Sequence, residues 1–95
     1  MTTEETNKIK AQYAQKGIEV YIDTLIKTQE RVLYYKRRLE ILSKKETLSA
    51  DEEKQKTELK ANIKSYTEGI EEAEVHIEIL RSLIESYSNN EPVKL

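Results

Sequence analysis

The 95-residue chain has no cysteine, tryptophan or phenylalanine, and it contains only two glycines and one proline. Without cysteine there is no disulfide framework and no thiolate chemistry. With so little glycine and proline, the chain lacks the residues on which tight turns depend. Charged residues make up 36% of the sequence. This composition predicts long solvated helices, and we therefore expect an all-α fold.

Long hydrophobic runs are also missing. No apolar stretch approaches the roughly 20 residues that span a bilayer, so we expect no membrane insertion. Residues 1–10 are polar and do not resemble an apolar export segment, which leads us to expect a cytoplasmic protein. A chain of this length forms at most one domain, residues 1–95, with a limited core. We therefore expect partners to contribute to that core.

What the sequence does contain is a regular seam of apolar residues between Leu59 and Tyr87. These residues recur in alternating steps of four and three: Leu59, Ile63, Tyr66, Ile70, Ala73, Ile77, Leu80, Ile84 and Tyr87. A matching seam precedes it, with Thr28 as its polar interruption: Ile18, Tyr21, Leu25, Thr28, Val32, Tyr35, Leu39 and Leu42. Ala11 and Ala14 continue this seam towards the N-terminus. A stripe this narrow needs another helix to cover it. The two seams predict an antiparallel two-helix coiled-coil hairpin.

Local patterns set the expected boundaries of the two helices. The first helix should run from about 5 to 45, with Thr3 or Thr6 as its N-cap. A turn at 46–49 follows, because Ser49 and Glu52 have the spacing of a capping box. The second helix should then span about 50–88, and residues 89–95 should form a loose tail that includes Pro92. An alternative with three helices has a break at Gly17, where glycine costs about 1 kcal/mol relative to alanine.

The two seams also predict a register. If residues whose numbers add up to 98 face each other, every seam residue meets another seam residue across the hairpin. The same register places Gly17 opposite Leu83 and Gly69 opposite Arg31, so that each glycine makes room for a long side chain. It also places Lys36 opposite Lys60, a less favourable pair.

Further apolar residues lie outside the seams at helical spacing: Ile22, Ile26, Leu33, Val75, Ile79 and Leu83. Two apolar stripes on each helix form a wider apolar surface than a single hairpin covers. We therefore expect a homodimer in which two hairpins pack through these residues into a four-helix bundle.

A second set of residues lies away from both the hairpin partner and this stripe. It consists of Tyr13, Val20, Tyr34 and Ile41. Tyrosine combines an apolar ring with a polar tip and is typical of protein interfaces. We expect this set to contact a different protein, so that the chain acts as a non-enzymatic interaction module: an adaptor, an inhibitor or a structural bundle.

Charge is distributed unevenly along the chain. Residues 24–67 contain 11 basic and 7 acidic residues, whereas the rest contains 5 basic and 11 acidic residues. A hairpin would therefore have a basic turn end and an acidic free end. The basic residues of 31–45 offer an alternative function, binding of nucleic-acid phosphates: Arg31, Lys36, Arg37, Arg38, Lys44 and Lys45. The acidic residues of 68–78 offer another, mimicry of a nucleic-acid backbone: Glu68, Glu71, Glu72, Glu74 and Glu78.

The sequence contains no recognisable catalytic, metal or cofactor motif. His76 is its one histidine, and Glu72 precedes it by one turn. A di-metal bundle would require the carboxylate three residues before the histidine, where Ala73 stands. Nucleophilic, zinc and phosphate-loop chemistry lack their usual residues. We therefore expect no enzyme activity, no metal and no cofactor.

Overall fold

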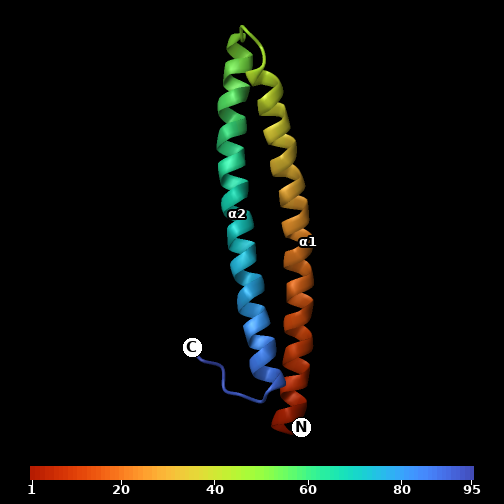
Figure 1. Cartoon of the computed structure of the whole chain (residues 1–95). Coiled ribbons are helices and arrows are strands. Elements are labelled where there is room, and N and C mark those ends of the chain that lie inside the picture. The colour runs from red at the N-terminus through yellow and green to blue at the C-terminus, as the bar shows by residue number, and fades with distance from the viewer. The chain divides into compact units, whose positions relative to one another are not determined.

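The computed structural model describes all 95 residues and contains two helices, α1 (Thr3–Ser43) and α2 (Ala50–Ser88), with no strand. The chain is all-helical, and its two helices pack against each other as a helical hairpin (Figure 1). Helix α1 continues through Gly17 without a break, so the three-helix alternative is wrong.

The chain divides into two compact units, each of which pairs a segment of α1 with a segment of α2. Unit 1 contains Met1–Leu25 and Glu72–Leu95, including both chain ends. Unit 2 contains Ile26–Glu71, including the connection between the helices. In each unit the two segments run in opposite directions.

Helix α1 begins and ends two residues earlier than the sequence predicted. Its N-cap is Thr2, and not Thr3 or Thr6: the Thr2 hydroxyl accepts a hydrogen bond from the Glu5 amide at 3.1 Å. Two acidic residues in the first turn favour this earlier start, because they complement the helix dipole. At the other end, the amides of Lys44 and Lys45 bond to carbonyls three residues back, which tightens the chain and ends the helix after Ser43.

The start of α2 is held by the capping box that the sequence indicated. The Ser49 hydroxyl accepts from the Glu52 amide at 3.2 Å, and the Glu52 carboxylate accepts from the Ser49 amide at 3.1 Å. Lys45 adds an ion pair to the same carboxylate. The end of α1 is thereby tied to the first turn of α2.

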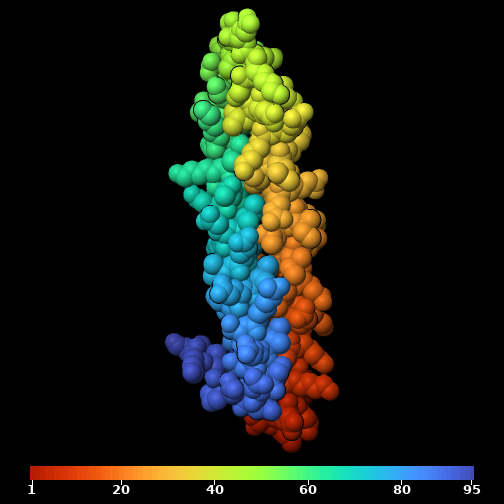
Figure 2. All heavy atoms as spheres, in the orientation of Figure 1, coloured from red at the N-terminus to blue at the C-terminus, as the bar shows by residue number.

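The end of α2 depends on Asn90, which adopts a left-handed backbone conformation with φ of 54°. The amides of Asn90 and Glu91 bond to the carbonyls of Tyr87 and Ser86, at 3.1 and 2.9 Å. Asparagine tolerates this conformation better than most residues, and helices commonly end this way. Residues 91–95 are not helical and stand out beside the end of α2 (Figure 2).

The buried apolar residues all belong to the predicted seams: Ala14, Ile18, Val32, Leu42, Ala73 and Ile77. Asn7 is buried as well, and it continues the spacing four residues before Ala11. Near the turn, half-buried Glu52 and Lys56 extend the α2 seam. No large side chain is fully buried, so the core within each unit is thin.

Most contacts across the helices agree with the predicted register to within one residue; the stacking of Tyr35 on Tyr66 departs from it by about one turn. Several of them join residues whose numbers add up to 97: Asn7 with Asn90, Tyr21 with His76, Arg31 with Tyr66 and Lys45 with Glu52. Gly17 makes room for a long side chain as expected, but for Leu80 and not Leu83, whereas the expected role of Gly69 was wrong. A Cβ on Gly17 would lie 3.1 Å from Leu80, whereas Gly69 has no neighbour within 4 Å. Arg31 contacts the Tyr66 ring, which lies one turn before Gly69.

Candidate functional site

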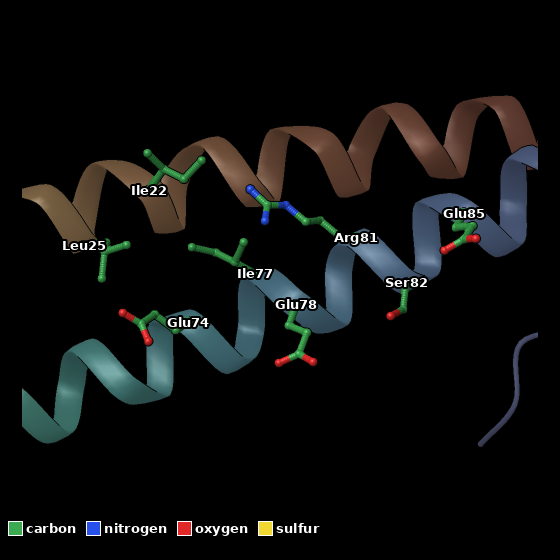
Figure 3. A pocket seen from close by; sticks show the side chains of 8 residues that line it. All are labelled: Ile22, Leu25, Glu74, Ile77, Glu78, Arg81, Ser82 and Glu85. Carbon is green, nitrogen blue, oxygen red and sulfur yellow. The ribbon is translucent and has the colours of Figure 1, made fainter.

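A cleft of about 520 Å³ lies between the helices of unit 1, and we call it the acidic cleft. Apolar residues from both helices and a row of charged residues from α2 line it: Ile22, Leu25, Glu74, Ile77, Glu78, Arg81, Ser82 and Glu85. Figure 3 shows Ile77 and the Arg81 guanidinium directed towards α1, whereas Glu78 points away from it. Three carboxylates against one guanidinium leave the cleft with a net charge of −2.

None of the carboxylates of the acidic cleft is in an ion pair within the chain. By contrast, Glu40 and Glu52 of unit 2 are each in ion pairs, with Arg37 and Lys44 and with Lys45 respectively. The acidic cleft therefore combines an apolar base with unneutralised negative charge. This combination suits a partner surface that is both basic and apolar.

Four of the six predicted dimer residues belong to unit 1 and two belong to unit 2. In unit 1, Ile22 lies in the acidic cleft. Ile79 and Leu83 instead line a neighbouring cleft, of about 570 Å³, together with the tail residues Pro92, Val93 and Leu95. The reason is helical geometry, since residues 79 and 83 lie about 140–180° round α2 from residues 74 and 81. Ser82 and Glu85 line both clefts. Val75 is 53% exposed and lines neither cleft.

The other two dimer residues lie on α1 in unit 2. Ile26 and Leu33 are 59% and 66% exposed, and their separation of seven residues places them on one side of the helix. Leu33 therefore stands among the most exposed aliphatic side chains of the molecule, and nothing within the unit covers it.

The second predicted set is exposed throughout, with Tyr13, Val20, Tyr34 and Ile41 between 50% and 69% accessible. Tyr13 and Val20 belong to unit 1, and Tyr34 and Ile41 belong to unit 2. A cation lies near each tyrosine: Lys16 is 5.4 Å from the Tyr13 ring and Arg38 is 5.9 Å from the Tyr34 ring. Such a contact contributes about 0.5–1 kcal/mol at an exposed site.

Tyr34 also borders a cleft of about 220 Å³ in unit 2, which we call the tyrosine cleft. Its lining comes from both helices: Tyr34, Tyr35, Arg38, Gln55, Glu58, Leu59 and Asn62. Arg38 donates a hydrogen bond to the Tyr34 hydroxyl at 3.1 Å. The Tyr34 and Tyr35 ring centroids are 5.8 Å apart, so the cleft has an aromatic edge.

The candidate phosphate-binding residues do not form one free basic surface. Five of the six have a partner within the chain: Arg31 with Tyr66, Arg37 and Lys44 with Glu40, Arg38 with Tyr34, and Lys45 with Glu52. Hydrogen bonding to Lys44, and then the charges of Lys44 and Arg37, lower the pKa of Glu40. Lys36 makes no polar contact and lies about 160° round α1 from Arg38.

The acidic residues of 68–78 are likewise divided. Glu74 and Glu78 line the acidic cleft of unit 1. Glu72 is exposed in unit 1, and Glu68 and Glu71 are exposed in unit 2.

His76 is used within the fold, where its ring stacks on Tyr21 with centroids 4.7 Å apart and an angle of 7° between the planes. No group of three or more histidine, cysteine, aspartate or glutamate side chains is placed to hold a metal ion. Neither helix contains a segment long and apolar enough to cross a membrane.

Sequence reasoning missed two features of unit 1. One is the contact between Asn7 and Asn90, although the spacing of the seam extends to residue 7. The other is the acidic cleft, since the sequence interpretation assigned Ile22 and the glutamates to separate surfaces. Charge patterning on α2, read together with its seam, would have placed Glu74 and Glu78 beside Ile77.

Comparison of the chain with protein-family models, with curated proteins and with solved structures finds no match.

Proposed function

We propose that the protein is a non-enzymatic interaction module: a coiled-coil hairpin that dimerises into a four-helix bundle and presents its outer side chains to another protein. The observation that carries the proposal is the amount of exposed apolar surface. Nine aliphatic and tyrosine side chains on the two helices are at least 36% accessible, while no large side chain is fully buried. Burying one leucine or isoleucine contributes about 1.5–3 kcal/mol, so association would add substantially to a thin core.

Within this proposal the dimer forms through the α1 residues Ile22, Ile26 and Leu33. The α2 residues Ile79 and Leu83 are less suitable, because they border the tail of their own chain. The set of Tyr13, Val20, Tyr34 and Ile41 then stays available for a second protein. Aromatic residues of this kind often supply the largest contributions at protein interfaces.

A pair of double variants tests this division of the surface. Ile26→Ser with Leu33→Ser should shift the chain from dimer to monomer in size-exclusion chromatography with light scattering. Val20→Ser with Ile41→Ser changes the same kind of side chain on the same helix and should leave the dimer intact. Loss of the dimer in the second variant and not in the first would contradict the proposal.

The nucleic-acid alternative has a separate test. Phosphate contacts release counterions, so such binding would be measurable at about 50 mM salt and would weaken steeply as salt rises. Because most of the basic residues already have partners, we expect no binding to duplex DNA, single-stranded DNA or RNA. Tight binding that is lost on Arg37→Glu with Arg38→Glu would favour the alternative instead.

A further inference from the structure

Unit 2 contains a surface that complements the acidic cleft, and we call it the basic face. It consists of Ile26, Leu33, Lys36, Lys60 and Lys64. Leu33 lies two residues after Arg31, which contacts Tyr66. Lys36 lies two residues before Arg38, which contacts Tyr34. Two residues correspond to about 200° of helix, which places Leu33 and Lys36 on the side of α1 away from those tyrosine contacts.

The same geometry applies to α2. Lys60 and Lys64 are each two residues from Asn62, which lines the tyrosine cleft. Both lysines therefore lie on the side of α2 away from that cleft. Opposite the tyrosine cleft, unit 2 thus presents Leu33 together with three lysines. All four side chains are exposed.

The three lysines of the basic face are in no ion pair of the chain. Lys36 of α1 and Lys60 of α2 are within one residue of facing each other in the register of the observed contacts, which brings two like charges to the same side of unit 2. Such an arrangement is unfavourable in an isolated chain and becomes favourable when a negative surface covers it.

The net charges of the two units have the same signs as these two surfaces. Unit 1 contains 9 acidic and 5 basic residues, a net charge of −4, whereas unit 2 contains 9 acidic and 11 basic residues, a net charge of +2. Two copies of this chain therefore attract each other when unit 1 of one copy meets unit 2 of the other, and repel when like units meet.

We infer that the acidic cleft of one copy binds the basic face of a second copy, with Leu33 of the second copy against Ile22 and Ile77 of the first. Lys36, Lys60 and Lys64 then lie beside Glu74, Glu78 and Glu85. In a twofold-symmetric dimer this contact occurs twice, because whatever one copy presents to its partner the partner presents in return. The inference rests on the proposed function and specifies its dimer as antiparallel.

Charge reversal with complementation tests the pairing. The first variant combines Glu74→Lys with Glu78→Lys, and the second combines Lys60→Glu with Lys64→Glu. Each variant alone places like charges together at both contacts and should dimerise about tenfold or more weakly than the wild type. In an equimolar mixture every contact is again between opposite charges, so a heterodimer of near wild-type affinity should form.

A matched control reverses the same number of charges on the same helix outside the acidic cleft, as Glu68→Lys with Glu72→Lys. All four positions of the two test variants are exposed, so circular dichroism should show an unchanged helix content. Dimerisation is measured by sedimentation velocity on each variant and on the mixture, with one variant carrying a fluorescent label.

The outcomes separate the inference from the proposed function. A wild-type dimer, weakened in both test variants and restored on mixing, supports the antiparallel pairing. A wild-type dimer that persists in both test variants, or that the control weakens equally, overturns the pairing and leaves dimerisation standing. A wild type that stays monomeric at tens of micromolar overturns both.

Discussion

The side-chain amide of Asn7 donates a hydrogen bond of 3.0 Å to the side-chain oxygen of Asn90, 83 residues further along the chain. Asn7 is the one buried polar residue of the protein, and Asn90 is the one residue other than glycine with a positive φ. The bond therefore joins the first turns of α1 to the left-handed residue that ends α2. One contact therefore connects the start of α1 with the end of α2 in unit 1.

The coupling between these asparagines can be measured. Asn90→Gly keeps the left-handed conformation accessible but removes the hydrogen bond, and Asn7→Ala removes its donor. We expect a double-mutant cycle in urea unfolding to give a coupling free energy of about 0.5–1.5 kcal/mol. Additive effects of the two substitutions would show that the hydrogen bond contributes nothing to stability.

The two glycines provide a matched pair of helix positions. Gly69→Ala meets no atom within 4 Å and should raise the free energy of unfolding by up to about 1 kcal/mol, because alanine favours helix. Gly17→Ala places its methyl group 3.1 Å from a Leu80 methyl carbon, so Leu80 must shift and the gain should be smaller. Thermal unfolding of the two variants gives the comparison, and a larger gain at Gly17 would contradict the packing of unit 1.

Burial within α2 predicts different effects for two neighbouring isoleucines. Ile77 is 7% exposed, and Ile77→Ala should lower the free energy of unfolding by about 2–5 kcal/mol because it leaves a cavity in the seam. Ile79 is 52% exposed, and Ile79→Ala should change it by no more than about 0.5 kcal/mol. Equal losses in urea unfolding would show that the seam has been assigned to the wrong face.

Glu52 should make the hairpin sensitive to acid. Hydrogen bonds from Lys45 and from the Ser49 amide hold the pKa of its carboxyl below the usual 4.5. Because the folded-state pKa is the lower one, the carboxylate stabilises the fold above pH 4.5, and this contribution is lost as the pH falls through the folded-state value.

The measurement is urea unfolding of the wild type and of Glu52→Gln at about pH 7 and about pH 3. Glu52→Gln should lose less stability than the wild type on acidification, since it has no carboxylate at position 52 to protonate. Lys45→Met removes the ion pair and keeps the capping box, and it should reduce the same pH dependence in part. An identical acid response in all three proteins would refute the assigned role of Glu52.

The fold was predictable because its determinants are local or strictly periodic. The spacing of Ile63, Ile70 and Ile77 identifies the covered face of α2 without knowledge of its partner, and Ser49 with Glu52 marks its first turn. The N-cap of α1 was not predictable with the same accuracy, because Thr2, Thr3 and Thr6 offer chemically equivalent hydroxyls within five residues.

The candidate site was harder to predict from the sequence than the fold. Residues at helical spacing lie on one face of their helix. On which side of the two-helix hairpin that face lies depends on how each helix is rotated about its own axis, and the spacing does not give this rotation. Ile22 and Ile79 were therefore assigned to one stripe, although the structure places Ile22 among the glutamates of α2 and Ile79 beside the tail.

Whether the chain associates with itself can be measured by sedimentation equilibrium of the unmodified chain at tens of micromolar. One chain has a mass of 11.1 kDa. We predict a fitted mass near twice that value, which falls towards the mass of one chain on dilution and on addition of salt. A well-folded species with the mass of one chain at every concentration would contradict the proposed self-association.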